Sequence, residues 1–286
     1  MMILSGPAGD PTRISLQGTV ALLLRDLVHE RTGIYFESDR LELLTDKLEA
    51  RVTARGCQSY LDYYYLLKYD EKGVEEWRRV MDAFSVQETY FWREFDQIRV
   101  LTGHFVPDFF RTHTRPMRIW SAACATGEEP YSIAMALAEA GWGGHPIEII
   151  GSDASESALT KARAHTYRER SFRSLPVALR DKYFTPRGEG FRLNDEIAGR
   201  VTFHWANLLD LGALPETAAV DVIFCRNVFI YFSAATISRT LATFAARLPA
   251  GGPLFVGASE SLLKLTNDFE LQEIGGAFAY VRKPGF

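Results

Sequence analysis

Along the first 85 residues, hydrophobic positions recur at the three- and four-residue spacing of amphipathic helices. The first predicted helix stops before Gly33 and carries an apolar face made of Leu16, Val20, Leu23, Leu24 and Leu27. A second runs from about residue 39 to residue 55, and Gly56 closes it. A third surrounds Tyr60, Leu61, Tyr64 and Leu67, and a fourth carries Val74, Trp77, Val80, Met81 and Phe84. This segment is therefore predicted to be a helical domain.

From about residue 117 the pattern changes to short apolar runs that alternate with helical segments. The predicted strands are residues 117–122, 147–152, 201–206, 220–226 and 253–258, with helices at 130–140 and 234–248 among the connections. Such alternation predicts an α/β fold with a mainly parallel sheet. Residues 270–274 and 277–282 flank two glycines and predict a terminal antiparallel hairpin. Residues 167–200 interrupt the alternation and are expected to form a small inserted subdomain.

Composition narrows the class of protein. The 286 residues are 24% charged with a net charge of −4, which gives no support for a nucleic-acid partner. No apolar run approaches the roughly 20 residues that span a bilayer, and the first ten residues lack the features of a secretory signal. The three cysteines are far apart and the histidines show no metal-ligand spacing. We therefore expect a cytoplasmic, metal-free protein without membrane insertion.

The loop after the first predicted strand carries two adjacent carboxylates. It reads SAACATGEEP over residues 121–130, so its small residues let backbone approach a ligand. Thr126 and Glu129 have capping-box spacing, so helix capping stays open as an alternative role for Glu129. Glu128 and Glu129 would repel the pyrophosphate that glycine-rich loops bind. The loop instead suits a ligand such as S-adenosylmethionine, which has a sulfonium, an amino group and a ribose.

Polar residues end the following strands as well. Asp153 ends the second strand, where a carboxylate can accept hydrogen bonds from ribose hydroxyls, although it could instead cap a helix starting near Ser155. Asn207 and Asn227 end the third and fourth strands. Because ligands bind at the carboxyl ends of strands in open parallel sheets, these residues predict a binding site there.

These residues resemble those of the chemotaxis protein methyltransferases, the CheR family, which form glutamate methyl esters on receptors. The motifs that carry the resemblance are residues 89–94 (TYFWRE), 120–132 (WSAACATGEEPYS), 152–153 (SD), 207–208 (NL), 224–232 (FCRNVFIYF) and 257–260 (GASE). The resemblance covers nearly the whole chain. It implies a Rossmann-like class I S-adenosylmethionine-dependent methyltransferase fold over residues 86–286, preceded by a receptor-docking helical domain over residues 1–85.

The resemblance also implies a set of residues that contact S-adenosylmethionine or its product, S-adenosylhomocysteine. The set is Gln87, Thr89, Arg93, Glu128, Asp153, Asn207, Leu208, Asn227 and Val228. Gln87 stands where the family often has asparagine, and Trp92 where phenylalanine is usual. The hairpin near residues 187–191 is shorter than in members that dock on a receptor's C-terminal peptide, so we expect that no such tether is needed.

Two residues are candidates for catalysis. A glutamate substrate has a pKa of about 4.3 and is already ionised at neutral pH, so no general base is required. Arg93 is expected to position a carboxylate, either that of the substrate or that of the cofactor. Tyr231 is expected to wall the methyl site and donate a hydrogen bond, with core packing beside Ile230 and Phe232 as the alternative.

The second predicted helix offers a candidate docking surface for a partner. Arg40, Lys47, Arg51 and Arg55 fall within an arc of roughly 80°. This basic strip could steer the glutamate-rich cytoplasmic helical region of a methyl-accepting chemoreceptor, or it could simply be a solvated face. With the first role, the enzyme would be recruited to membrane receptor arrays and would serve sensory adaptation.

Two other functions remain open from the sequence. The chain could methylate another protein or a small molecule, or it could be a non-catalytic adaptor that senses S-adenosylmethionine. An NAD-dependent oxidoreductase is disfavoured by the acidic loop. The receptor, the methylated glutamates, the oligomeric state and the regulation are not encoded in any motif, nor is the choice between motility and another output.

Overall fold

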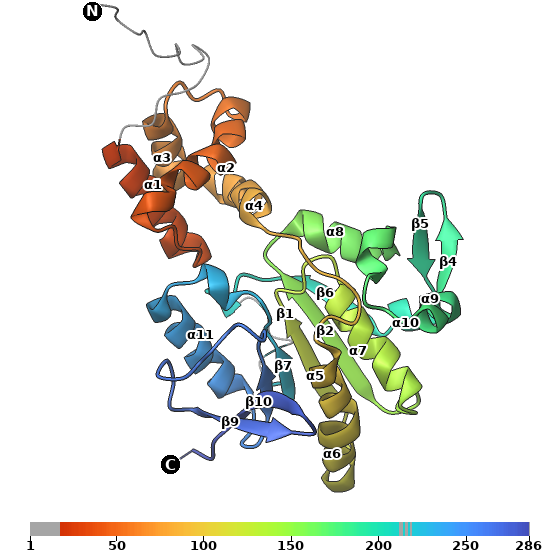
Figure 1. The fold of residues 1–286 in the computed structure, drawn as a ribbon. Helices are drawn as coiled ribbons and strands as arrows, with labels where there is room; N and C mark the ends of the chain where they lie inside the picture. The colour runs from red at the N-terminus through yellow and green to blue at the C-terminus, as the bar shows by residue number, and fades with distance from the viewer. Residues whose placement is uncertain (1–17, 212–213, 215–216, 218, 286) are drawn as a thin grey trace, which may run out of the picture. The chain divides into compact units, whose positions relative to one another are not determined.

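The computed structural model describes residues 18–211, 214, 217 and 219–285 (Figure 1). The chain divides after Phe84 into two compact units. Within the described residues, no helix is both long and apolar enough to cross a bilayer. The same residues contain no group of three or more His, Cys, Asp or Glu side chains that could hold a metal ion.

The first unit is helical, as the sequence predicts. Its helices are α1 (Gly18–Thr32), α2 (Leu41–Ala54), α3 (Tyr60–Tyr69) and α4 (Gly73–Phe84), with a 3-10 turn (Ser38–Arg40) before α2. Gly33 and Gly56 follow α1 and the end of α2 with φ of 80° and 67°, a conformation that glycine adopts without strain. The core contains Leu24, Val28, Leu44, Leu48, Val52, Tyr60, Tyr63, Val80 and Phe84.

The predicted apolar face of the first helix is wrong at one position. Leu23 is 40% exposed, while Ala21, Leu24, Leu27 and Val28 are buried. At 100° per residue, Leu23 lies about 100° from Leu24 around the helix axis and so misses the buried stripe. Leu16, which the same prediction included, lies outside the described residues.

The second unit is built on a seven-stranded sheet with the order β6-β2-β1-β7-β8-β10-β9. Its parallel strands are β1 (Met117–Ala122), β2 (Ile147–Asp153), β6 (Val201–Trp205), β7 (Val222–Phe224) and β8 (Pro253–Phe255). The terminal hairpin, β9 (Phe269–Ile274) and β10 (Ala277–Arg282), adds two antiparallel strands. The predicted sheet and hairpin are confirmed, although β7 and β8 are shorter than expected. Strand order reverses at β1 and β7, where such sheets bind ligands.

Helices cover both faces of this sheet (Figure 1). One face packs on α7 (Glu128–Glu139) and on α5 (Phe95–Val100), which continues through a π-helical turn (Leu101–Phe105) into α6 (Val106–Thr112). The other face packs on α11 (Ala234–Arg247). Because neighbouring strand residues point to opposite faces, Ile119 joins the first core and Trp120 the second. Helix α8 (Glu156–Ala164) follows β2.

The expected inserted subdomain is present between α8 and β6. It contains a three-stranded antiparallel sheet, β3 (Thr166–Tyr167), β5 (Gly190–Leu193) and β4 (Phe184–Arg187), with helices α9 (Val177–Tyr183) and α10 (Asp195–Ala198). The β4–β5 hairpin is four residues long on each side and turns at Gly188, whose φ is 59°. Phe91 packs on Phe172 and Phe184, which joins the subdomain to the segment before α5.

Candidate active site

The loop between β1 and α7 is held in an unusual backbone conformation. Ala123 and Ala125 have φ of 57° and 47°, and Gly127, the residue that precedes α7, has φ of 91°. A Cβ on Gly127 would lie 2.9 Å from Cβ of Ala162, so only glycine fits there. Left-handed non-glycine residues are unfavourable and persist where surrounding contacts impose them, which is common at functional sites.

The capping box that the sequence left open as an alternative does not form. Thr126 does not cap α7, because the left-handed turn at Gly127 separates Thr126 from the first amides of the helix. The Oγ1 of Thr126 instead donates to Oε2 of Glu128 at 2.6 Å. Glu129 also has other partners, since it accepts from Oγ of Ser121 and from Nε of Arg226, each at 2.6 Å. Glu129 is therefore engaged by Ser121 and Arg226, and the carboxylate of Glu128 by Thr126 and by its own backbone N–H at the start of α7.

Glu128 is a buried carboxylate at the start of α7. It is 3% exposed and accepts hydrogen bonds from Thr126 and, at 3.1 Å, from Oγ of Ser171 in the inserted subdomain. Burial raises the pKa of Glu128, and the hydrogen bonds from Thr126, from its own backbone N–H and from Ser171 only partly oppose this. A cationic ligand group beside Glu128 would favour its ionised form, whereas a phosphate would not.

Asp153, at the end of β2, binds the backbone of the same loop. Its Oδ2 accepts from the backbone N–H of Ala125 and its Oδ1 from that of Ser155, both at 2.8 Å. The alternative in which Asp153 caps the next helix is not observed, because Oγ of Ser155 accepts from the N–H of Ala158 and caps α8. Asp153 thus fixes the loop conformation.

Asn207 and Leu208 follow β6 at the same edge of the sheet. Asn207 accepts from the N–H of Leu209 at 3.0 Å and so stabilises the turn with its own side chain. Leu208 is buried in the second core, and Val228 packs against that core from the loop after β7. The strand order brings the ends of β6, β2, β1 and β7 side by side, so these four loops border one edge.

Asn227, after β7, has a buried acceptor without a partner. Its φ is 60°, and its N–H donates to Oε2 of Glu260 at 2.8 Å. Glu260 also accepts from the N–H groups of Phe229 and Gly257 at 2.7 and 2.6 Å. A Cβ on Gly257 would lie 2.6 Å from Nδ2 of Asn227, so the amide packs directly on this glycine. The Oδ1 of Asn227 is buried and accepts no hydrogen bond, as expected for an atom that meets a ligand donor.

The segment before α5 carries the remaining candidates. Gln87 donates to Oγ of Ser157 at 3.2 Å and accepts from Nζ of Lys161 at 2.7 Å, which attaches it to α8. Thr89 is half-buried. The guanidinium of Arg93 lies 5.6 Å from the ring centre of Tyr90 and donates to the Glu88 carbonyl at 3.2 Å.

Tyr231 ends a 3-10 helix (Phe229–Tyr231) after β7. It is 37% exposed and Ile230 is 55% exposed, whereas Phe229 is buried in the second core. Core packing after β7 is therefore supplied by Phe229, with Phe232 at its border, and the ring of Tyr231 is accessible.

Sequence reasoning missed the role of Arg226, which lies within a quoted motif. Its side chain is 2% exposed, and besides Glu129 it donates to the backbone carbonyls of Arg93 and Glu94 and to Oε1 of Gln97. The signal was an arginine directly after the apolar strand run VIFC, since a buried charge requires a partner. The identity of that partner is not readable from sequence.

In the helical unit, the basic strip is partly engaged by an internal carboxylate. Glu76, whose side chain is fully buried, accepts from Nε and Nη2 of Arg51 at 2.9 and 2.8 Å and from Nε of Arg55. Lys47 donates to the Ala83 carbonyl at 3.1 Å, and Arg40 is exposed. Arg51 and Arg55 thus stabilise the fold of this unit, whatever else they bind.

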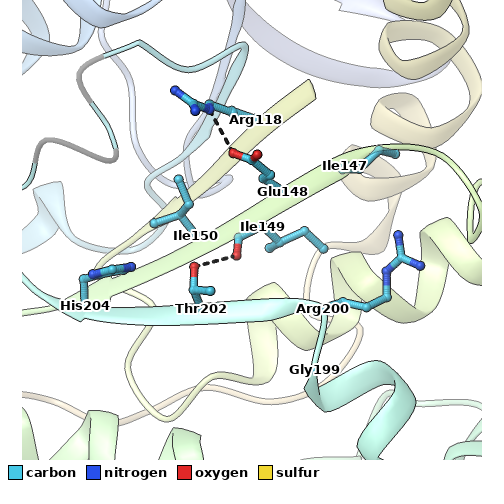
Figure 2. A pocket seen from close by; sticks show the side chains of 9 residues that line it. All are labelled: Arg118, Ile147, Glu148, Ile149, Ile150, Gly199, Arg200, Thr202 and His204. Atoms are coloured by element: carbon cyan, nitrogen blue, oxygen red, sulfur yellow. Dashed lines mark hydrogen bonds and ion pairs between the residues drawn. The ribbon is translucent and has the colours of Figure 1, made fainter. Parts of the chain in front are cut away.

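A surface pocket lies on the same sheet but away from the strand ends described above. Figure 2 shows side chains from the amino-terminal halves of β1 and β2 and from β6, including the ion pair between Arg118 and Glu148 at 2.9 Å. Arg118 is the second residue of β1 and Thr202 the second of β6. Ligands of open parallel sheets bind at the carboxyl ends, so this pocket is not the candidate site.

Comparison with known proteins points to one family. The model described as CheR methyltransferase, SAM binding domain, matches residues 87–277, and the model described as CheR methyltransferase, all-alpha domain, matches residues 22–85. Chemotaxis protein methyltransferase 2 of Vibrio cholerae is 35% identical over 267 residues, covering 90% of this chain and 91% of that protein. The chemotaxis protein methyltransferase of Escherichia coli is 33% identical, covering 95% and 96%. The probable biofilm formation methyltransferase WspC of Pseudomonas putida is 32% identical, covering 90% of this chain and 60% of that protein.

Proposed function

The chain belongs to the CheR methyltransferase family, and from that premise we propose that it methylates glutamate side chains of chemoreceptors with S-adenosylmethionine. The observation that carries the proposal is the edge formed by the loops after β1, β2, β6 and β7, with the buried carboxylate of Glu128 and the unpartnered Oδ1 of Asn227. An anion and an acceptor fit a ligand that has a sulfonium, an amino group and hydroxyls but no phosphate.

The proposed contacts to S-adenosylmethionine and its product are Gln87, Thr89, Arg93, Glu128, Asp153, Asn207, Leu208, Asn227 and Val228. The ligand supplies a methyl group activated by its sulfonium. Glu128 compensates positive charge on the ligand, Asp153 accepts from its hydroxyls, and Asn227 accepts from one of its donors. Leu208 and Val228 contribute apolar contact. The amide of Gln87 already bonds Ser157 and Lys161, so it acts partly by holding its segment against α8.

Catalysis in this proposal consists mainly of alignment. The substrate carboxylate is ionised at neutral pH, so the protein needs to orient it rather than deprotonate it. Arg93 orients a carboxylate by charge-assisted hydrogen bonds. Tyr231, with its accessible ring and hydroxyl, walls the methyl site and donates a hydrogen bond. Full activity in both Arg93→Ala and Tyr231→Phe would refute these roles.

The helical unit is the proposed docking domain for the cytoplasmic helical region of a receptor. Its basic strip of Arg40, Lys47, Arg51 and Arg55 retains partial exposure, with 24% and 28% for the Arg51 and Arg55 side chains. Docking of this kind would recruit a cytoplasmic enzyme to receptor arrays. The four-residue strands of the β4–β5 hairpin support the further proposal that no receptor tail peptide is needed as a tether. Tight binding of that peptide in a titration would overturn it.

The deciding experiment is methyl transfer from labelled S-adenosylmethionine to receptor-containing membranes, followed by mild base and capture of methanol. Base-labile label is the expected result, because carboxyl methyl esters hydrolyse to methanol. Base-stable label would mean that the methyl group is transferred to a substrate group other than a carboxylate. Absence of label despite measured binding of S-adenosylmethionine would favour the non-catalytic adaptor. The likeness to a methyltransferase named for biofilm formation makes membranes with receptors of non-motility arrays the second substrate to try.

A further inference from the structure

Arg226 is a buried cation whose hydrogen bonds hold the backbone of a distant segment. Its Nη1 donates to the carbonyl of Arg93 at 2.9 Å, to that of Glu94 at 3.3 Å and to Oε1 of Gln97 at 3.2 Å. The side chain is 2% exposed, so these contacts are made away from water. Hydrogen bonds from a charged donor in such surroundings are strong and directional.

The segment held in this way adopts a conformation that its own residues disfavour. Trp92 and Glu94 have φ of 66° and 48°, and Glu94 immediately precedes α5. Left-handed conformations at bulky residues persist only where neighbouring groups impose them. The N–H of Trp92 donates to Oγ of Ser132 at 3.1 Å, and Glu94 accepts from the N–H of Ala258 at 3.2 Å. Arg226 binds the two carbonyls that follow Trp92, at the centre of the turn.

The charge of Arg226 is matched chiefly by Glu129, while the Glu94 carboxylate lies 3.8 Å from its Nη1, and these contacts reach several strand ends. Oε2 of Glu129 lies 2.6 Å from Nε of Arg226, and Oε1 accepts from Ser121 in β1. Gln97 donates to the Val256 carbonyl, after β8, at 2.8 Å. The turn that carries Arg93 is therefore attached to the ends of β1, β7 and β8 through one buried network.

We infer that Arg226 is a positioning residue for methyl transfer: by holding the carbonyls of Arg93 and Glu94, it sets the direction in which the Arg93 side chain leaves the turn. The inference rests on the proposed function, since it requires that Arg93 bind a carboxylate of the substrate or cofactor. Arg226 itself is directed to protein groups and acts through Arg93. Misplacement of a positioning group by about 1 Å can slow a reaction about 100-fold.

The test is a double-mutant cycle on receptor methylation by the full chain, using Arg226→Gln, Arg93→Ala and the two combined. Each single variant is expected to lower kcat about 100-fold, and the combined variant no further than the slower single variant, because both changes remove the same alignment. Arg247→Gln is the matched control: Arg247 also donates to a backbone carbonyl, that of Leu211, and to Oγ1 of Thr217. It should lower the melting temperature and leave kcat unchanged.

A second variant separates positioning from folding. Arg226→Gln leaves Glu129 without its cation, and the protein could lose activity by unfolding alone. The paired variant Arg226→Gln/Glu129→Gln replaces the ion pair by two amides, so its melting temperature should recover while kcat stays low. Recovery of kcat together with stability would overturn the inference, because it would assign Arg226 a structural role only.

Failure of the inference is distinguishable from failure of the proposed function. If Arg93→Ala retains full kcat, the role proposed for Arg93 is wrong, and with it the basis of the inference. If Arg93→Ala is slow but Arg226→Gln keeps wild-type kcat, or if the two losses multiply to about 10,000-fold, Arg93 keeps its role and Arg226 does not position it.

Discussion

At the scale of single residues, the burial of Glu128 carries a cost in stability that its proposed contact with S-adenosylmethionine would explain. Its burial raises its pKa, so the folded protein binds this proton more tightly than the unfolded chain does. The stabilising effect of the protonated form is complete below the unfolded pKa and is lost as pH rises through the folded pKa. Above its folded pKa, the ionised carboxylate of Glu128 therefore opposes folding, as is common for groups that serve binding.

Glu128→Gln should consequently change stability and binding in opposite directions. We expect a higher melting temperature at neutral pH and a dissociation constant for S-adenosylmethionine raised about tenfold or more, since a charge-assisted hydrogen bond is worth roughly 1.5–3 kcal/mol. Calorimetry measures both. In the wild type, affinity should weaken as pH falls through the raised pKa of Glu128, whereas the variant should show no such dependence. A variant with lower stability and unchanged affinity would contradict this account.

The contact between Gly257 and Asn227 allows a second residue-scale test. A Cβ at position 257 would displace the amide of Asn227, which lies 2.6 Å from that Cβ position, and so move the unpartnered acceptor. Gly257→Ala should weaken S-adenosylmethionine binding about tenfold, the equivalent of roughly 1.4 kcal/mol. Gly144→Ala is the control, since a Cβ there meets nothing within 4 Å. Equal affinity for S-adenosylmethionine in both variants would mean that Asn227 does not contact this ligand.

At the scale of elements, α2, α3 and α4 are joined by a buried carboxylate. Glu76 on α4 accepts from Arg51 and Arg55 on α2, and from the hydroxyl of Tyr63 on α3 at 2.7 Å. Burial raises the pKa of Glu76, but the hydrogen bonds from Arg51, Tyr63 and Arg55 outweigh it, so the pKa lies below its usual range. The stabilisation is present above the ordinary glutamate pKa and is lost as pH falls through the lowered one.

Glu76→Gln should therefore destabilise the helical unit by about 3 kcal/mol, because two arginines lose a buried partner. Thermal unfolding followed by circular dichroism at neutral pH measures this, and the difference from wild type should shrink as pH falls through the lowered pKa of Glu76. Glu75→Gln is the control, because Glu75 is the residue next to Glu76 and its side chain is exposed. If the two variants have the same melting temperature at neutral pH, the hydrogen bonds to Glu76 contribute no stability.

At the scale of the whole molecule, the two units have separable proposed tasks. The described loops of the sheet edge belong to the second unit, and the basic strip belongs to the first. Arg51 and Arg55 are poor probes of docking, because reversing their charge would also disrupt Glu76. Arg40, which is exposed, tests docking without that complication.

Arg40→Glu should raise KM for the receptor several-fold and leave the affinity for S-adenosylmethionine unchanged. The difference from wild type should diminish at high salt, because charges at an exposed interface are screened over about 10 Å at 0.1 M ionic strength. Lys72→Glu, an exposed charge reversal near α4, controls for net charge. Equal loss in both variants would mean that steering depends on overall charge and not on the strip.

The helices, the strands, the inserted subdomain and the family were predictable because each leaves a local pattern. An apolar helix face with a 3.6-residue period can be recognised within a short stretch of sequence. The same holds for an apolar run that ends in a polar residue and for a motif such as FCRNVFIYF. The motifs also identified Asp153 as the last residue of β2, whereas Asn227 lies in the loop three residues after β7 ends at Phe224. The prediction for Leu23 was wrong because its helical angle lies outside the buried stripe, and the capping box left open at Thr126 does not form because Gly127 precedes α7.

The sequence by itself thus determined the two folds, the edge of the sheet where the proposed site lies, and the two carboxylates in its first loop. Only the tertiary structure decided which charges meet. Arg226 and Glu129 are 97 residues apart, and Arg51 and Glu76 are 25 apart, so no spacing rule connects them. A buried charge demands a partner, but chain folding alone chooses which one, because the choice depends on the packing of whole elements.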